Sequence, residues 1–92
     1  MRKTRVSQAS AGAFLEILRM LGDGEKRFSE IRKNAGRSDK TVSDTLRKAE
    51  NFRLVDKKPV KKEGEVFAAY SLTPQGNRFV REVLEWERKL TQ

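Results

Sequence analysis

The chain has 92 residues, of which 37% are charged and 36% hydrophobic, and its 21 Lys and Arg outweigh 13 Asp and Glu to give a net charge of +8. A chain of this length forms one domain, and so small a hydrophobic fraction suggests that a second copy adds buried surface. The absence of cysteine and histidine excludes disulfides, thiolate chemistry, Cys/His zinc sites and the usual general base. We therefore expect no enzyme, no metal and no cofactor.

The excess of positive charge indicates a polyanionic partner, with nucleic acid ahead of an acidic membrane surface. A charge that serves only solubility is the plainer alternative. No apolar run approaches the length of a membrane span, and the start MRKTRVSQAS lacks the apolar region of a secretory signal. We expect a cytoplasmic, nucleoid-associated protein without a membrane partner.

The chain is predicted to begin with a flexible basic arm at residues 1–8, followed by a single domain at 9–92. The stretch 10–22 is predicted to form a helix, with Ser10 as N-cap and Gly22 as its stop. Its apolar residues recur at i, i+3, i+4 and i+7, which is one helical face. They are Phe14, Ile17, Leu18 and Leu21.

Residues 25–28 are predicted as a short strand or extended link from which Phe28 points inward. A two-turn helix follows, with Ser29 as N-cap, Glu30 in the first turn and Gly36 at its end. The inner face of this helix is predicted to carry Ile31 and Ala35.

A third helix is predicted at about 38–51, capped by Ser38 or Asp39. Its buried stripe consists of residues at i, i+4 and i+7, namely Val42, Leu46 and Ala49. Two short helices joined by a tight glycine-containing turn form a helix-turn-helix.

A lysine-rich β-hairpin is predicted at about 54–72. Pro59 predicts that the first strand lies at the sheet edge, and Gly64 marks the turn. A last helix at about 73–90 begins with Thr73 as N-cap and Pro74 at its first position, and Gly76 is expected to weaken its first turn slightly. This element order predicts an α+β fold that is mostly α. It is a winged helix-turn-helix with a three-helix core, a two-stranded β wing and a long C-terminal helix.

Several short motifs occur in a fixed order between residues 14 and 80. They are Phe28-Ser29-Glu30-Ile31, Ser38, Thr41-Val42-Ser43, Leu46, Leu54-Val55, Tyr70-Ser71-Leu72-Thr73 and Gly76. This ordered set resembles the winged helix-turn-helix transcription regulators of prokaryotes, of the HxlR-like and MarR/ArsR-like groups. The chain departs from the resemblance at Ala49 and Arg53, where family members often have Leu and Gly. It also lacks the cysteine common near the N-terminus of HxlR-like proteins, so the resemblance does not extend to thiol-based sensing.

The resemblance implies that the third helix enters the major groove of double-stranded DNA. Its candidate contact residues are Ser38, Lys40, Thr41, Ser43, Asp44, Arg47 and Lys48. Asp44 could accept from a cytosine amino group, but we favour an ion pair with Lys40 or Lys48 one turn away. Ser38 could serve only as a cap, and Thr41 could be half-buried.

Further basic residues flank the turn and cover the hairpin, where they are predicted to contact the DNA backbone or minor groove. They are Lys33, Arg37, Lys57, Lys58, Lys61 and Lys62. Lysine suits a phosphate better than a base edge. The alternative is that the hairpin lysines protect an edge strand from pairing with other chains.

The last helix carries more apolar surface than one small core needs, and related regulators dimerise at this place. The predicted dimerisation residues are Phe79, Val83, Trp86 and Leu90. A twofold dimer sets two recognition helices about 34 Å apart, one turn of DNA. The alternative is that the helix folds back on its own chain and that Trp86 is a local core residue.

The sequence thus predicts a homodimeric transcription regulator, with no evident small-molecule effector. Two alternatives remain open: a non-specific architectural DNA-binding protein, and a winged helix that docks another protein. No cluster of His, Cys or paired carboxylates supports an enzymatic mechanism.

Overall fold

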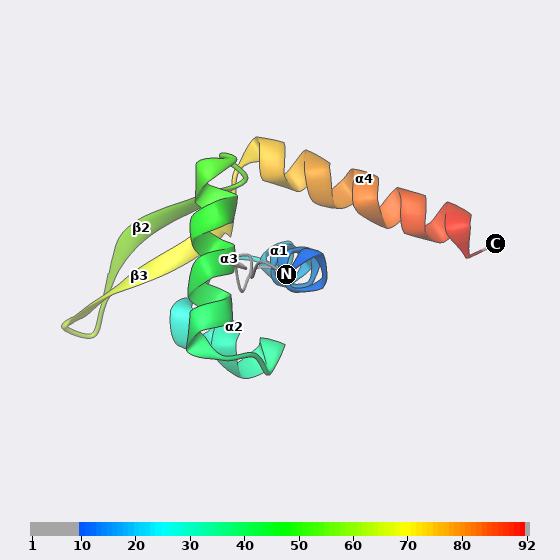
Figure 1. The fold of residues 1–92 in the computed structure, drawn as a ribbon. Coiled ribbons are helices and arrows are strands. Elements are labelled where there is room, and N and C mark those ends of the chain that lie inside the picture. The colour runs from blue at the N-terminus through cyan, green and yellow to red at the C-terminus, as the bar shows by residue number, and fades with distance from the viewer. Residues whose placement is uncertain (1–9, 92) are drawn as a thin grey trace.

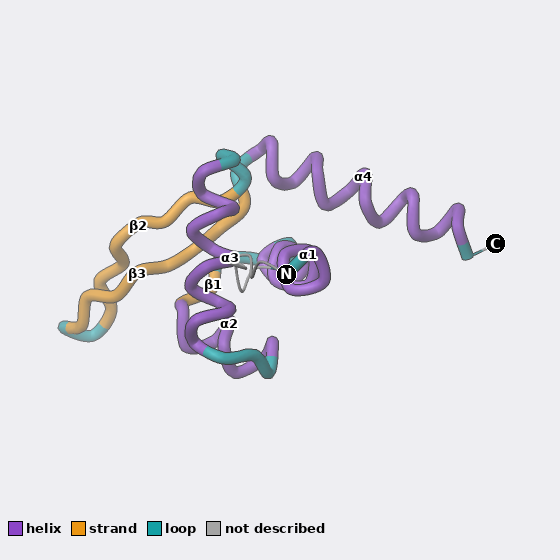
Figure 2. Tube along the Cα trace, viewed as in Figure 1, coloured by secondary structure: helices purple, strands orange, loops and turns teal. Residues whose placement is uncertain are grey.

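The computed structural model describes residues 10–91, and the predicted arm at 1–8 lies outside the described residues. In residues 10–91 of the chain, four helices and three strands follow one another in the predicted order, and one strand, β1, joins the hairpin in a sheet (Figures 1 and 2). The elements are α1 (Ala11–Leu21), β1 (Lys26–Arg27), α2 (Phe28–Ala35), α3 (Asp39–Asn51), β2 (Val55–Lys62), β3 (Glu65–Leu72) and α4 (Pro74–Leu90). Within the described part of the chain, none of the helices combines the length and apolar character needed to cross a bilayer.

Helix α1 packs one face into the hydrophobic core. Ser10 caps it by accepting a hydrogen bond from the Ala13 N–H at 3.2 Å, and the helix ends at Gly22, as predicted. Its buried side chains are Ala13, Ile17, Leu18 and Leu21, whereas Phe14 is half-buried at the edge of the same face. The predicted stripe is therefore confirmed, with its centre rotated slightly toward Ala13.

The start of α2 differs from the prediction. Its N-cap is Arg27, two residues earlier than Ser29, and the Glu30 carboxylate accepts the Arg27 backbone N–H at 2.9 Å. Arg27 is extended because it pairs with Ala69 of β3, so the helix begins directly after the strand. Gly36 ends α2 in the left-handed conformation, with φ of 63°, as expected for a glycine stop.

Helix α3 agrees closely with its prediction. Ser38 is the N-cap, and Val42, Leu46 and Ala49 are buried against the rest of the core. Thr45 is a fourth buried residue that the pattern did not predict, and its hydroxyl has no hydrogen-bond partner among the described residues. Helix α3 therefore has a continuous inner face, and its opposite face is directed outward.

The sheet has the strand order β1-β3-β2, so the hairpin strand with Pro59 lies at an edge, as predicted. The tip of the β2–β3 hairpin is a two-residue turn in which Glu63 and Gly64 have φ of 51° and 82°. Positive φ at both positions is the hairpin geometry that matches strand twist. The root of the hairpin belongs to the core, because Val55 and Tyr70 are buried there, while the outer half projects as a wing (Figure 1).

Helix α4 starts at the root of the wing and extends over α1 (Figure 1). Thr73 caps it by accepting the Gly76 N–H at 2.9 Å, and Arg19 of α1 forms an ion pair with Glu87. Gly76 has a larger role than a weakened first turn. A Cβ at that position would lie 2.0 Å from the Leu54 carbonyl oxygen, so only glycine lets α4 approach the end of α3 this closely.

Gly76→Ala is expected to destabilise the protein by about 3 kcal/mol, because a backbone oxygen cannot move aside as a flexible side chain can. Chemical denaturation measures the change. Gly12→Ala is the matched control: a Cβ at Gly12 meets nothing within 4 Å, so no loss of stability is expected there. Equal stability of both variants would contradict the close approach.

Candidate nucleic-acid interface

The outward face of α3 presents two cations. Because the inner face is buried, the side chains of Lys40 and Arg47 are directed to solvent, where they are 71% and 67% exposed. Ser43 is half-buried beside them, and Lys48 is exposed. The face therefore combines exposed cationic groups with a hydroxyl, and groups of these kinds can donate to base edges and phosphates.

Asp44 lies between the two cations of this face. Its carboxylate contacts Lys40 Nζ at 3.5 Å and Arg47 Nη1 at 3.3 Å, and the side chain is only 14% exposed. The predicted pairing with Lys40 is thus confirmed, and Arg47 takes the second position that was considered for Lys48. Because Lys40 and Arg47 themselves are largely exposed, each pair contributes only about 0–1 kcal/mol, so the pairs orient both cations without making them unavailable to a ligand.

The hydroxyls at the start of α3 contact each other. The Ser38 Oγ accepts the Thr41 N–H at 3.2 Å and donates to Thr41 Oγ1 at 3.0 Å. Ser38 is therefore a cap in this structure, and Thr41 is half-buried, as considered.

The turn before α3 is held by ion pairs that the sequence did not predict. Arg37 Nε contacts Glu16 Oε1 at 2.9 Å, which ties the turn to α1, and Arg32 Nε contacts Asp39 Oδ1 at 2.9 Å. A phosphate contact by Arg37 stays a prediction, and it would compete with Glu16. Lys33 is exposed on α2.

The wing lysines divide between two faces, because side chains alternate along a strand. Lys57 lies opposite Tyr70 and Lys61 opposite Val66, on the face whose inner end packs on the helices. Lys57 Nζ lies 6.0 Å from the Tyr70 ring centroid, which agrees with this assignment. Lys58 and Lys62 are on the other face, so the four lysines predicted as one group form two pairs.

Arg27 connects the wing to the helix-turn-helix through contacts that the sequence did not predict. The Arg27 guanidinium carbon lies 4.1 Å from the Phe67 ring centroid, and Arg27 Nη2 is 3.9 Å from Glu65 Oε1. Arg27 is also the N-cap of α2. Arg27 therefore contacts the wing from the start of the first helix of the motif.

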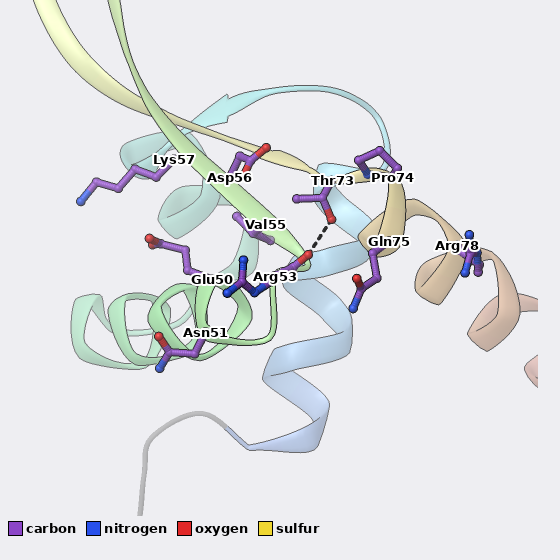
Figure 3. Close-up of a pocket in the computed structure, with 10 residues that line it drawn as sticks. All are labelled: Glu50, Asn51, Arg53, Val55, Asp56, Lys57, Thr73, Pro74, Gln75 and Arg78. Atoms are coloured by element: carbon purple, nitrogen blue, oxygen red, sulfur yellow. Dashed lines mark hydrogen bonds between the residues drawn. The ribbon is translucent and has the colours of Figure 1, made fainter.

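At the root of the wing, an open surface hollow of about 850 Å³ lies between α3, β2 and α4 (Figure 3). Arg53, Lys57 and Arg78 line it together with Glu50 and Asp56. Of these five residues, only Lys57 was predicted to contact DNA. Arg53 carried a signal, because family members often have glycine at that position, whereas no pattern distinguished Arg78.

The apolar stripe of α4 is only partly used inside the chain. Phe79 packs edge to face on Phe14 with ring centroids 6.2 Å apart, and Val83 is half-buried. Trp86 and Leu90 are 62% and 78% exposed. Trp86 is therefore no core residue of the described chain.

Comparison with known proteins identifies the family. The model of the HxlR-like helix-turn-helix family matches residues 14–91. The chain belongs to this HxlR-like family. Its members are transcription regulators rather than enzymes, and membership implies DNA binding. No match was found among curated protein sequences.

Solved structures agree with the HxlR-like fold. The reduced form of the transcriptional regulator YodB from B. subtilis is 26% identical with a TM-score of 0.74, over 82% of this chain and 74% of that one. A PadR family regulator from Clostridium difficile is 19% identical with a TM-score of 0.79, over 85% and 88%. A homodimeric winged helix-turn-helix DNA-binding domain from Mycobacterium bovis is 20% identical with a TM-score of 0.73, over 89% and 73%.

In this HxlR-like chain, Ser38→Ala is expected to lower the free energy of unfolding by about 1 kcal/mol, because the Thr41 N–H loses its cap. Thermal or chemical unfolding measures the loss. Ser43→Ala, in the same helix, is the control, since Ser43 caps nothing and alanine favours helix. A Ser38→Ala variant as stable as the wild type would contradict the capping role.

Proposed function

We propose that this chain is a homodimeric, sequence-specific transcription regulator that inserts α3 into the major groove and places its wing on the adjoining backbone or minor groove. The observation that carries the proposal is the outward face of α3, where Lys40 and Arg47 are exposed on either side of Asp44. An α-helix fits the major groove, and arginine or lysine can donate to guanine O6 and N7.

Asp44 has a defined part in this proposal. By holding Lys40 and Arg47 in two directions, it limits the positions that their tips sample before DNA arrives. It also repels phosphates, so the cations gain more from base edges than from the backbone. Ser43 lies next to this set and offers a hydroxyl to either kind of partner.

The proposed role of the wing is affinity rather than base recognition. Lys57 and Lys61 share the face that continues from the helical core, so they accompany α3 toward the same side of a duplex. Lys58 and Lys62 are directed away from that side. If the whole domain neutralises six phosphates, the logarithm of the DNA association constant falls with the logarithm of the salt concentration at a slope of roughly −5, called the salt slope below.

The proposed dimer rests on the exposed end of α4. Two large apolar side chains, Trp86 and Leu90, are displayed on a helix that projects over α1 (Figure 1). Exposed apolar patches of this kind mark interaction sites, and the similar Mycobacterium bovis domain is described as homodimeric. A twofold axis there would present two α3 helices to successive turns of a duplex.

The function is tested by selecting duplexes from a random pool. We expect enrichment of a palindrome with half-sites one helical turn apart. In gel-shift titrations, Arg47→Ala is expected to weaken the selected site by about tenfold and random DNA much less, because a base contact carries about 1–3 kcal/mol of discrimination. A selection without any enriched sequence would instead favour the non-specific architectural protein.

The two lysine pairs of the wing provide an internally matched experiment. Replacing Lys57 and Lys61 by Ala is expected to weaken all duplexes alike and to reduce the salt slope by about 2. The same replacement of Lys58 and Lys62 removes equal charge from the other face and is expected to have a smaller effect on both quantities. Equal effects of the two double variants would contradict the proposed docking of the wing.

Trp86→Asp is expected to convert a dimer into a monomer of 10.6 kDa, because it places a charge in a desolvated interface. Light scattering after size exclusion measures the mass. Arg81→Asp is the control, since Arg81 lies on the opposite side of α4 from Trp86 by helical geometry. Wild-type protein that is monomeric in this measurement would refute the dimer.

A further inference from the structure

Arg53 occupies a backbone position that ordinarily belongs to glycine. Its φ is 61°, in the left-handed region, two residues after the end of α3. The Arg53 N–H donates to the Glu50 carbonyl at 2.9 Å, and the Leu54 N–H donates to the Ala49 carbonyl at 2.9 Å. This pair of bonds is the Schellman motif, in which glycine is the preferred residue at the left-handed position. An arginine there is held at a conformational disadvantage.

The side chain of Arg53 lies in the hollow at the root of the wing. Figure 3 shows Arg53 just after α3, Lys57 on β2 and Arg78 on α4. Within residues 10–91, none of these three cations has a carboxylate oxygen within ion-pairing distance. Together they line one open hollow of about 850 Å³.

The lining of the hollow restricts the kind of anion that it suits. Glu50 and Asp56 also line it, so the three cations face two carboxylates. For a small free anion, attraction to the three cations would be offset by repulsion from the two carboxylates, so its binding would be weak. A phosphate that belongs to a polymer already attracted by the +8 chain needs only a local donor, and the arginine fork supplies two parallel N–H groups.

We propose that this hollow seats the sugar-phosphate strand of bound DNA, with Arg53 as its principal phosphate ligand and Arg78 and Lys57 beside it. The inference rests on the proposed function. In that docking, α3 occupies a major groove and the wing the adjoining minor groove, and these grooves are separated by one phosphate strand. The hollow lies between the same two elements, which is where that strand crosses the protein.

Arg53→Gly separates binding from stability, because the two are expected to change in opposite directions. Glycine relieves the left-handed conformation, so the melting temperature is expected to rise by about 4 °C. Loss of the phosphate contact is expected to weaken selected and random duplexes alike, by about tenfold, and to reduce the salt slope by about 1. Affinity and slope equal to the wild type would overturn the proposal.

Two variants serve as controls. Glu63→Gly relieves the other positive φ of a non-glycine residue in the described chain, 51° at the wing tip, so it is expected to raise the melting temperature without weakening binding. Arg53→Lys keeps the charge and is expected to keep most of the salt slope. A Glu63→Gly variant that binds as weakly as Arg53→Gly would show that turn geometry, rather than the Arg53 side chain, controls affinity, and would overturn the proposal.

Whether the hollow binds a DNA phosphate or a free anion is tested by adding inorganic phosphate as a competitor of duplex binding at constant ionic strength. We expect no competition at millimolar phosphate. Competition abolished by Arg53→Gly would assign the hollow to a free anion instead. If the wild type binds no duplex at low salt, the proposed function itself is wrong. If the wild type binds and Arg53→Gly binds equally well, only the proposed binding of the phosphate strand in the hollow is wrong.

Discussion

Two neighbouring carbonyl oxygens, those of Arg53 and Leu54, determine how α3, the wing and α4 leave a common point. The Arg53 oxygen accepts the Thr73 hydroxyl at 2.7 Å, and the Leu54 oxygen accepts the Thr73 N–H at 3.0 Å. Gly76 rests against the same Leu54 oxygen with no space for a side chain. Because the end of α3 is bonded to the start of α4 here, the wing between them must leave and return at one place. The proposed interface depends on that junction for its geometry.

Elsewhere, charge pairs orient the surface rather than stabilise it. Arg37 with Glu16 and Arg32 with Asp39 are partly exposed pairs, which contribute little free energy singly. Their effect is directional, since they connect the turn of the helix-turn-helix to α1 and α2 to α3. Asp44 does the same for the cations of α3. In a protein with net charge +8, the carboxylates of Glu16, Asp39 and Asp44 thus lie beside cations of the proposed interface.

Local patterns predicted most of the helices and strands. The apolar spacing of α1, α3 and α4, the caps at Ser10, Ser38 and Thr73 and the stop at Gly36 all act within a few residues of one another, so sequence alone revealed them. The start of α2 was wrong because its cap depends on β1, and β1 exists only through pairing with β3, more than 40 residues away. Thr45 was missed for a similar reason: a polar residue type gives no sign that a neighbouring helix buries it.

What the sequence by itself determined is the family, the order of the elements and the inward faces of α1, α2 and α3, because helical and strand periods translate directly into buried stripes. It also identified Lys40, Asp44 and Arg47 as neighbours on one helix, since i,i+3 and i,i+4 spacing guarantees proximity. Only the tertiary structure decided that the wing lysines face two ways, that Arg37 is engaged by Glu16 and that Arg53 and Arg78 share a hollow. These facts depend on strand register and on the junction at Leu54 and Gly76, which bring together residues that no local period relates.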